Sequence, residues 1–423
     1  MLDIHFIREN TDIVKAGAVK KHIEVDIDRL LMVDNERRAL RQSLETKRAE
    51  QNRRSREVGL IKGDMQNTLL EAMRQLKAGM AEDEERLKEV MEEWQRLMLL
   101  VPNVPDISVP DGDGDGENME IKKWGDITTF DFEPKGHVEL MTELGMADFE
   151  RGAKVAGFRG YFLKGDGVLL TMAVWQLALK HFAGKGLNPL IVPSLVRRET
   201  FLGTGYLPQG EDDLYKTQDG DYLAGTGEVA TMGYYMNETL DLKELPLQFL
   251  AFSPCFRREA GAHGKDVRGL IRVHEFFKWE QVVLCGALHD ESARLHEWIN
   301  RNTEEFIELL GIPYHTVVNC GGDLGLGQVK KYDIELWVPG EKTYREISSA
   351  SYFHDFQARR LNIRYRDDEG VMRFAHSLNS TAIPTPRILV SIIENYQQAD
   401  GTIRVPEALV PYVGKSVIGV PAA

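Results

Sequence analysis

The sequence predicts an α+β protein in which a long antiparallel helical hairpin precedes a domain built on an antiparallel sheet with flanking helices. Three observations carry this prediction. Apolar residues recur at steps of three and four over residues 69–101, a short segment rich in proline and glycine follows, and β-rich runs then alternate irregularly with helical ones. The 423 residues exceed what one compact core usually supports, so two domains are expected.

The helical hairpin is expected at about residues 27–101. Its second helix follows a coiled-coil seam that is interrupted only where Asp83 takes its turn, and its first helix grows polar toward the far end. The expected turn is Gly63-Asp64. Two helices of about 35 residues, at 1.5 Å rise per residue, make a rod roughly 50 Å long. The apolar seam positions of the second helix are Leu69, Met73, Leu76, Met80, Leu87, Val90, Trp94, Leu97 and Val101.

The charge of the chain is unevenly distributed. A net charge of −14 argues against a nucleic-acid partner, because affinity for phosphates comes from clustered lysine and arginine. Between Arg37 and Lys62, however, nine basic residues stand against three acidic ones. A plain spacer or dimerisation coil would explain the helical periodicity alone, whereas the basic far half of the hairpin favours a polyanionic partner.

Residues 102–118 are predicted to be a linker, because their prolines and Asp-Gly pairs break both helix and strand. We therefore expect an N-terminal domain at 1–103 and a second domain at 104–423. In the second domain the runs LQFLAFSPCF, RVHEFFKWEQVVL and YDIELWV are expected to be strands, and LTMAVWQLALKHFAGKG a helix. The absence of a strict strand-helix rhythm favours an antiparallel sheet over a doubly wound one.

The composition is that of an ordinary soluble globular protein, with 43% apolar and 28% charged residues. The first ten residues, MLDIHFIREN, lack an apolar block behind a basic start, and no apolar run is long enough to span a bilayer. We therefore expect a cytoplasmic protein without a membrane partner. Cys255, Cys285 and Cys320 are odd in number and widely spaced, which favours reduced, buried thiols over disulfides or a zinc site.

The segment FRREAGAHGKDVRGLIRVHEFFKWE, residues 256–280, is predicted to form a strand, a glycine-bearing loop and a second strand. A solvated face with cross-strand ion pairs is the ordinary explanation for so many charges, but an aromatic side chain gains little there. Arginines for phosphates, an aromatic for a base and carboxylates for amino groups would instead suit an anionic planar ligand. The residues expected to share one face are Arg257 and Glu259 on the first strand, and Arg272, His274, Phe276, Lys278 and Glu280 on the second.

The segment HSLNSTAIPTPRILVSIIENYQ is predicted to end in a helix. Thr385 is expected to cap this helix, Pro386 to take its first position and Arg387 to face a ligand from its first turn. The alternative is that Arg387 is an ordinary surface arginine. The buried stripe of the helix is expected to be Ile388, Leu389, Ile392 and Ile393.

The pattern F-R-x-E, a loop, then R-x-x-x-F-x-x-x-E resembles motif 2 of class II aminoacyl-tRNA synthetases, and RGLIRVHEF is close to the seryl branch of that family. In the same order, GLNPLIVPSLV resembles motif 1 with its proline at Pro193, REISSASYFHDFQARRLNIRYR resembles the stretch before motif 3, and the segment with Arg387 resembles motif 3. The resemblance runs nearly end to end and includes the hairpin. It implies the class II antiparallel sheet with flanking helices and an N-terminal coiled-coil arm.

The resemblance also implies an activity. The protein would activate L-serine with ATP and Mg²⁺, then transfer it to tRNA(Ser), with tRNA(Sec) as a further candidate acceptor. The hairpin would reach the long variable arm of the tRNA, with Arg53, Arg54 and Arg56 near its tip meeting phosphates. Motif 1 would form the interface of a homodimer. Neither a membrane nor DNA is implied as a partner.

Position by position, the resemblance assigns an ATP site with Arg257, Arg272 and Arg387 as the catalytic arginines. In-line attack on a phosphate needs positioning and charge neutralisation more than a protein base, which suits arginine and a hard cation. The roles are Arg257 at the α-phosphate and the serine carboxylate, Arg258 within the ATP site, Glu259 at the adenine amino group, Phe276 stacked on adenine beside the Val273 backbone, Arg272 and Arg387 at the γ-phosphate, and Glu346 with Ser349 at Mg²⁺.

The same comparison assigns a serine site, in which a buried carboxamide and hydroxyl would satisfy the hydroxyl of the substrate. Its residues are Thr226 and Glu228, Arg257, Glu280 at the ammonium group, and Asn379 with Thr381 at the hydroxyl. Gly227, Ala350, Tyr352 and the run IPTPR depart from the common family pattern.

Two other functions are considered. A synthetase paralogue that loads a carrier protein is expected to lack the arm, and a coiled-coil scaffold on an inactive synthetase fold is expected to have lost the ATP residues.

Overall fold

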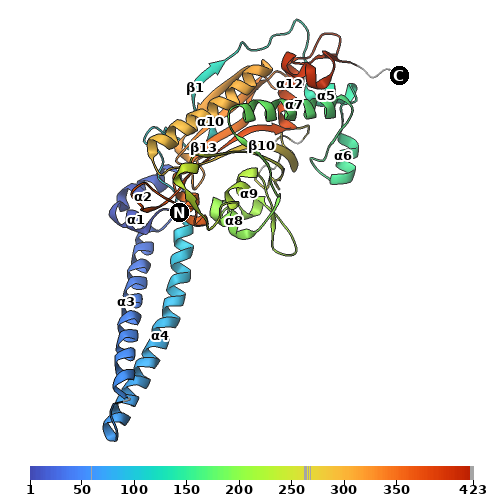
Figure 1. The fold of residues 1–423 in the computed structure, drawn as a ribbon. Coiled ribbons are helices and arrows are strands. Elements are labelled where there is room, and N and C mark those ends of the chain that lie inside the picture. Colours follow the sequence, from blue (N-terminus) through green and yellow to red (C-terminus); the bar gives the residue numbers. More distant parts are fainter. Residues whose placement is uncertain (59, 262–263, 265, 267, 420–423) are drawn as a thin grey trace. The chain divides into compact units, whose positions relative to one another are not determined.

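The computed structural model describes residues 1–58, 60–261, 264, 266 and 268–419. The chain divides into two compact units (Figure 1). The first contains Met1–Val19 and Ile23–Pro102, and the second contains Lys20–His22 and Asn103–Ala423. None of the helices in the described part of the chain is long and apolar enough to cross a membrane.

The first unit is helical. Two short helices, α1 (Ile4–Glu9) and α2 (Thr11–Lys20), precede the two long helices α3 (Ile27–Val58) and α4 (Asp64–Leu100). The long helices run side by side as the predicted hairpin (Figure 1). Gly63, with φ of 79°, precedes α4, so the predicted turn is confirmed at a position where the left-handed backbone favours glycine.

The interruption of the coiled-coil seam at Asp83 is a polar contact inside the hairpin. The Asp83 carboxylate accepts hydrogen bonds from Ser43 Oγ at 2.7 Å and Lys47 Nζ at 2.8 Å. Lys47 Nζ also donates to the backbone oxygen of Gly79 at 3.0 Å. The polar positions of the two helices therefore face one another, which ties the register of the hairpin to one specific pairing. Apolar seam residues on either side are buried, among them Leu30, Val33 and Leu44 of α3 and Met80, Val90 and Leu97 of α4.

The second unit is built on an eight-stranded sheet, which confirms the predicted α+β class. All neighbouring strands pair antiparallel except β4, which runs parallel to β9 at one edge. The predicted strand at RVHEFFKWEQVVL begins three residues later than expected, at Glu275. In spatial order the strands are β1 (Met119–Trp124), β11 (Tyr314–Val318), β12 (Lys330–Val338), β13 (Thr343–Tyr352), β16 (His376–Thr385), β10 (Glu275–Cys285), β9 (Leu247–Phe256) and β4 (Asn188–Ile191).

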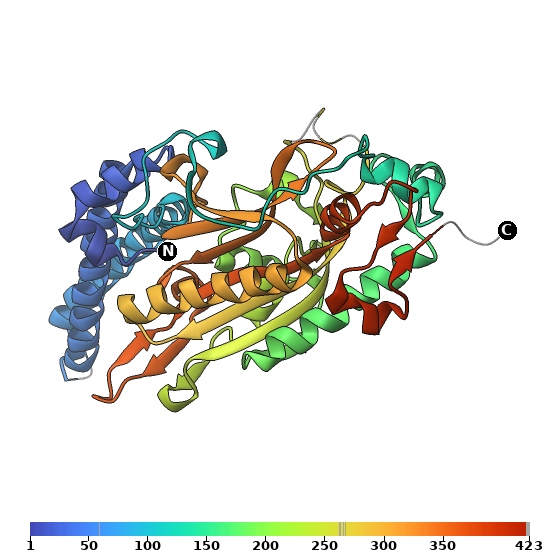
Figure 2. The ribbon, with the colours of Figure 1, turned by 90° about the horizontal axis from the view of Figure 1, so that it is seen from above.

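Helices cover both faces of this sheet (Figures 1 and 2). On one face lie α7 (Asp166–Gly184), α10 (His289–Leu310) and α12 (Arg387–Asn395), and on the other α8 (Arg198–Thr204) and α9 (Gly227–Gly233). The remaining elements are α5 (His137–Glu143), α6 (Phe149–Ala156), α11 (Phe356–Leu361), α13 (Val410–Val413), β2 (Ala147–Asp148), β3 (Phe162–Leu163), β5 (Leu195–Val196), β6 (Tyr215–Lys216), β7 (Tyr222–Leu223), β8 (Thr239–Asp241), β14 (Arg364–Arg366), β15 (Met372–Phe374), β17 (Ile403–Arg404) and β18 (Val417–Ile418), with short 3-10 turns at 115–117, 211–213, 242–244, 321–323 and 407–409.

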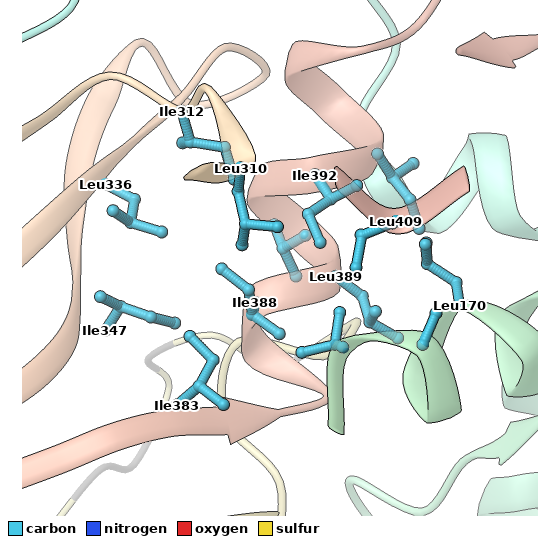
Figure 3. Close-up of a cluster of buried hydrophobic side chains, with 14 of the residues drawn as sticks. Leu170, Leu310, Ile312, Leu336, Ile347, Ile383, Ile388, Leu389, Ile392 and Leu409 are labelled. Carbon is cyan, nitrogen blue, oxygen red and sulfur yellow. The ribbon is translucent and has the colours of Figure 1, made fainter. Parts of the chain in front are cut away.

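The main core lies between the sheet and α12. Figure 3 shows Ile388 of α12 directed toward Ile347 of β13 and Ile383 of β16, and Leu389 of the same helix beside Leu170 of α7. The predicted apolar stripe of this helix is confirmed, because all four of its residues are fully buried. This packing anchors the first turn of α12, and with it Arg387.

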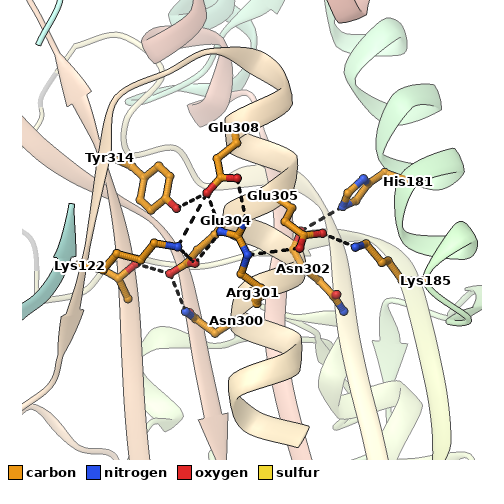
Figure 4. Close-up of polar contacts among 11 residues, drawn as sticks. Lys122, His181, Lys185, Asn300, Arg301, Asn302, Glu304, Glu305, Glu308 and Tyr314 are labelled. Atoms are coloured by element: carbon orange, nitrogen blue, oxygen red, sulfur yellow. Dashed lines mark hydrogen bonds and ion pairs between the residues drawn. The ribbon is translucent and has the colours of Figure 1, made fainter. Parts of the chain in front are cut away.

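Ion pairs and hydrogen bonds connect α10 to the strands β1 and β11 at the edge of the sheet (Figure 4). Arg301 forms ion pairs with Glu304 at 3.1 Å and Glu308 at 2.5 Å along the helix. Lys122 of β1 contacts Glu304, and the hydroxyl of Tyr314 on β11 donates to Glu308 at 2.8 Å. Because the charged side chains of α10 and β1 are paired with one another, we interpret these contacts as structural.

The described residues 102–118, the predicted linker, contain no helix or strand apart from the turn at 115–117, and β1 begins directly after them. From Asn103 onward it belongs to the second unit and is hydrogen-bonded to the rest of that unit. The Asn103 side chain donates to the backbone oxygens of Gly327 at 3.0 Å and Phe353 at 2.8 Å. Asp106 accepts from the hydroxyl of Tyr352 at 2.9 Å, which gives a structural use to one of the residues that depart from the family pattern. The three cysteines are free and buried, as predicted.

Candidate active site

Two adjoining cavities open on the face of the sheet that α9 covers. The first, here called the Phe276 cavity, is lined by Glu259, Val273, Phe276, Arg387 and neighbours. The second, the Thr226 cavity, has a volume of about 320 Å³ and is lined by Thr226, Glu228, Glu280, Ser349, Asn379 and neighbours. Four residues line both cavities: Arg257, Lys278, Glu346 and Thr381. A ligand in one cavity would therefore meet a ligand in the other at these four side chains.

Strand β10 presents Phe276, Lys278 and Glu280 to the cavities, which confirms the predicted alternation for these three. The prediction is wrong for His274. The strand begins only at Glu275, and the backbone before it turns, so His274 contacts Phe158 and Tyr215 beside another cavity. Its Nδ1 lies 3.0 Å from the backbone oxygen of Arg257. Arg272 likewise lies before the strand and not on its face.

Arg257 follows the last residue of β9 and stands between the cavities. Its Nε donates to the backbone oxygen of Gly225 at 3.3 Å, and its guanidinium carbon lies 5.3 Å from the centre of the Phe276 ring. The backbone contact fixes the direction of the guanidinium. Arg258, the next residue, is exposed and does not appear among the described residues that line either cavity.

Glu259 and Arg272 pair with each other. Arg272 Nη1 lies 2.5 Å from the Glu259 carboxylate, and its Nε lies 3.3 Å from Asp266. The sequence assigned the two residues to opposite ends of a nucleotide. Because the arginine and the carboxylate already neutralise each other, a nucleotide that used both would have to separate them.

Arg387 is the first residue of α12 and is anchored by backbone. Its Nε donates to Ile271 O at 2.8 Å and its Nη1 to Glu346 O at 2.9 Å. Two of the five N–H donors of the guanidinium are thus used, and the remainder are available to an anion. Burial lowers the pKa of Arg387, because the charged guanidinium is less well solvated in the site than in water.

The predicted cap of α12 is wrong. Pro386 occupies the N-cap position, without a side-chain cap, and Arg387 is the first helical residue. Thr385 cannot cap because it ends β16, opposite Phe277, and its hydroxyl accepts a hydrogen bond from Trp175 Nε1 at 2.8 Å. The strand therefore takes precedence over the local capping preference.

Glu346 and Ser349, the residues predicted for Mg²⁺, lie on β13 and both line the Thr226 cavity. No group of three or more histidine, cysteine, aspartate or glutamate side chains in the described chain is arranged to hold a metal. Two oxygen ligands suit Mg²⁺, which keeps several waters and completes its shell with substrate phosphates. Asp333, opposite Ser349 in the register, is a residue that the sequence did not reveal; burial raises its pKa to about 6.

The Thr226 cavity brings the predicted serine residues together. Thr226 caps α9, its Oγ1 accepting from the backbone N–H of Glu228 at 3.3 Å. The Glu228 carboxylate accepts from Tyr206 at 2.9 Å and Gln357 at 2.7 Å, and burial raises its pKa to about 7. Asn379 Nδ2 lies 3.4 Å from the Glu280 carboxylate. Thr381 lies opposite Glu280 in the sheet.

Three side chains that line this cavity or contact its lining were not predicted as site residues. Lys278 was visible in the alternating pattern of β10 but received no role. Tyr206 and Gln357 hold Glu228 from distant parts of the chain, and no local pattern marks them. Gly227, one of the departures, is the first residue of α9; a Cβ there would lie 3.3 Å from Ala251 Cβ and from Ser253 Oγ, so glycine relieves close packing.

In the hairpin, Arg53 pairs with Glu50 at 2.7 Å and Glu57 at 3.0 Å, and Arg54 pairs with Glu50 at 2.5 Å. These hydrogen bonds, that from Arg53 first, lower the pKa of Glu50 to about 2. Arg56 is exposed and makes no ion pair among the residues described. The basic segment is therefore partly neutralised within its own helix.

Two family models match the sequence. The seryl-tRNA synthetase N-terminal domain matches residues 1–105, and the tRNA synthetase class II core domain (G, H, P, S and T) matches residues 214–396. The serine–tRNA ligase of Deinococcus radiodurans is 45% identical over 423 residues, which is 100% of both chains. The serine–tRNA ligase of Petrotoga mobilis is 43% identical over 426 residues, covering 99% of this chain and 100% of the relative.

Solved structures agree. The seryl-tRNA synthetase from Pyrococcus horikoshii, complexed with ATP, is 39% identical with a TM-score of 0.93 over 100% of both chains. The cytoplasmic serine–tRNA ligase from Naegleria fowleri, in complex with AMP, is 31% identical with a TM-score of 0.88, covering 100% of this chain and 99% of the other. The prolyl-tRNA synthetase of Giardia lamblia, at 13% identity and a TM-score of 0.56 over 65% of this chain and 55% of the other, shares the fold alone.

Proposed function

The chain belongs to the seryl-tRNA synthetase family, and from that premise we propose how its two cavities divide the work of a serine–tRNA ligase. ATP occupies the Phe276 cavity and L-serine the Thr226 cavity. The observation that carries the proposal is that Arg257, Lys278, Glu346 and Thr381 line both cavities, so the reacting ends of the two substrates meet there.

The first half-reaction joins serine to AMP. A carboxylate oxygen of serine attacks the α-phosphorus of ATP, a new P–O bond forms, and the bond to pyrophosphate breaks in line with it. Arg257, positioned by Gly225 O, holds the α-phosphate and the serine carboxylate together. Arg387, positioned by two backbone carbonyls, and Arg272 neutralise the charge of the leaving pyrophosphate. No proton has to move to a protein base in this step.

Mg²⁺ would be held by Glu346 and Ser349, and when bound it would neutralise phosphate charge. Phe276 stacks on adenine beside the Val273 backbone, and Glu259 accepts from the adenine amino group after release from Arg272. Arg258 stays in the proposal only as an outer contact of ATP, because it is exposed.

In the Thr226 cavity, Glu280 and Glu228 attract the ammonium group of serine, Thr226 contributes a hydroxyl, and Asn379 with Thr381 face the serine hydroxyl. This assignment is supported by the lining of one cavity by all five of these side chains.

The second half-reaction uses the arm. A terminal ribose hydroxyl of tRNA(Ser) attacks the serine carbonyl, an ester bond forms, and AMP leaves. The N-terminal unit, proposed at 1–103 with residues 102–118 as the connection to a catalytic unit at 104–423, binds the long arm of the tRNA through Arg53, Arg54 and Arg56. tRNA(Sec) is a further candidate acceptor. Since tRNA charging serves protein synthesis, the proposed location is the cytoplasm.

The proposed assembly is a homodimer through motif 1. Exposed apolar side chains on α7, such as Leu169 and Met172, and Ile191 on the edge strand β4 support this interface. Pro193 lies between Ile191 and the exposed Leu195, which extends the same apolar surface. Light scattering should give about twice the 48.0 kDa of one chain; an active species of one chain's mass would contradict the dimer.

The decisive experiment is ATP/pyrophosphate exchange with each of the twenty amino acids, followed by charging of bulk tRNA. We expect strong exchange with serine alone and charging of serine tRNA only. Exchange with another amino acid but not with serine would contradict the serine site, and exchange without any tRNA charging would support the carrier-loading alternative.

A further inference from the structure

The ammonium group of Lys278 lies at the centre of the serine residues, yet the mechanism above gives it no role. Lys278 is 5% exposed and belongs to β10. Its Nζ donates to Thr226 Oγ1 at 2.9 Å and to Thr381 Oγ1 at 3.4 Å, and it forms an ion pair with the Glu280 carboxylate. These partners are the N-cap residue of α9, a residue of β16 and a residue of β10, so one cation connects three elements around the Thr226 cavity.

A lysine ammonium has three N–H donors and no acceptor. Two of these donors go to the Thr226 and Thr381 hydroxyls, and the charge of the ammonium group is balanced by the Glu280 carboxylate in an ion pair. Because these three side chains surround the ammonium group, Lys278 can act on a substrate through the orientation of the two hydroxyls and the carboxylate.

The hydrogen bonds from Lys278 determine which way the two threonine hydroxyls can act. A hydroxyl has one donor and two lone pairs. Thr226 Oγ1 accepts from Lys278 and from the backbone N–H of Glu228, so both lone pairs are occupied and only its O–H remains for a ligand. Thr381 Oγ1 accepts from Lys278 as well, so its O–H cannot point at the ammonium group, and because Thr381 lines the cavity this O–H is within reach of a ligand there. Both hydroxyls are thus donors toward the substrate.

We propose that Lys278 is a positioning residue for substrate specificity: it commits the Thr226 and Thr381 hydroxyls to donating and holds the Glu280 carboxylate, so that the cavity requires an amino acid with a side-chain oxygen acceptor. The inference rests on the proposed function. An alanine side chain in the same place would leave a committed donor without a partner, which is the situation that rejects ligands lacking a hydroxyl.

The test compares serine with L-alanine in wild type and Lys278→Met. Both amino acids carry the same ammonium and carboxylate, so the ratio of the KM for serine to the inhibition constant of alanine isolates the hydroxyl. We expect Lys278→Met to raise the KM for serine by a factor on the order of 10² and to reduce the preference for serine over alanine about tenfold. The KM for ATP should change by less than about twofold. Unchanged preference would overturn the proposal.

A double-mutant cycle tests whether the effect passes through Thr381. Thr381→Val keeps the shape of the side chain and removes the hydroxyl. In the Thr381→Val background, Lys278→Met should no longer change the preference for serine over alanine, because the donor that Lys278 directs is gone. Independent, multiplying effects on this preference would mean that Lys278 acts on the substrate by another route, and the proposal would fail.

Lys330→Met is the matched control, since Lys330 belongs to the same sheet but lies over the Tyr332 ring on the face that α10 covers; it should leave the preference unchanged. If Lys278→Met does not fold, Lys278→Ala is assayed with propylammonium, which replaces the missing atoms. Saturable recovery of serine exchange supports the role of the ammonium, and no recovery by the folded variant opposes it. Failure of wild type to exchange with serine would instead refute the proposed function itself.

Discussion

Asp83 in the hairpin and Arg387 in the second unit are both polar residues set beside apolar stripes, and their surroundings differ. Asp83 finds Ser43 and Lys47 within the hairpin, at 2.7 and 2.8 Å. Arg387 uses two donors on backbone carbonyls and directs the remainder at a cavity. A polar side chain whose charge and hydrogen bonds find partners within the protein has a structural role. A polar side chain that the protein holds in place, but whose remaining donors face a cavity, can bind a ligand.

The arginines of the chain differ in the same way. Arg53 and Arg54 are paired with glutamates of their own helix, and Arg301 with three glutamates on α10. Arg257 has a backbone carbonyl and an aromatic ring as neighbours. Charge patterns in the sequence mark all of these residues alike, and only the structure shows which of them are already paired with carboxylates.

The first prediction, with the largest expected effect, concerns Arg387, whose remaining donors face the cavity. Arg387→Ala should lower serine activation by a factor on the order of 10² or more, because it removes phosphate stabilisation worth roughly 3 kcal/mol. Arg301→Met, which removes a satisfied arginine, should leave the rate of pyrophosphate exchange near that of wild type. Similar losses in both variants would erase the distinction between open and satisfied arginines.

The comparison also shows what the sequence could predict. Periodicity identified the hairpin, its turn at Gly63, the strand at 247–256 and the stripe of α12, because burial of one face dictates each pattern. It failed at Thr385, where pairing with β10 overrode a capping preference, and at His274, where the strand began late. Contacts between distant segments, such as Tyr206 and Gln357 with Glu228, leave no local pattern to read.

The second prediction concerns the arm. Reversing Arg53, Arg54 and Arg56 to glutamate should weaken tRNA binding by a factor on the order of 10 and flatten its salt dependence by about one unit of slope per lost phosphate contact. Serine activation should survive, so exchange and aminoacylation are measured side by side. Because Arg53 is already paired and Arg56 is not, Arg56→Glu alone should weaken binding more than Arg53→Glu. Equal loss in both assays would indicate misfolding.

The third prediction concerns Glu228, a buried carboxylate that has partners within the protein and also faces a cavity. Glu228 is held by Tyr206 and Gln357 yet lines the cavity, and burial raises its pKa to about 7. Only the ionised carboxylate attracts the serine ammonium, and its fraction grows as pH rises through 7. The KM for serine should therefore fall several-fold from pH 6 to pH 8, and Glu228→Gln should flatten this dependence. A KM for serine that is independent of pH in wild type would argue against Glu228 as a contact of the ammonium.

The last prediction has the smallest effect and tests the structural side of the comparison directly. Lys47 and Asp83 form an ion pair with each other, and both side chains keep access to water. If this pair has only a structural role, Asp83→Ala should lower the Tm of the hairpin by a few degrees at most. Serine activation should not change. Replacing both residues with leucine continues the apolar seam, so the double variant should melt no lower than wild type. The double variant should instead lose specificity in the alignment of α3 against α4, because the polar pair no longer disfavours a shifted register. A disulfide between cysteines placed at facing seam positions would report that register; formation with equal yield in wild type and the double variant would show that the apolar seam alone determines the alignment.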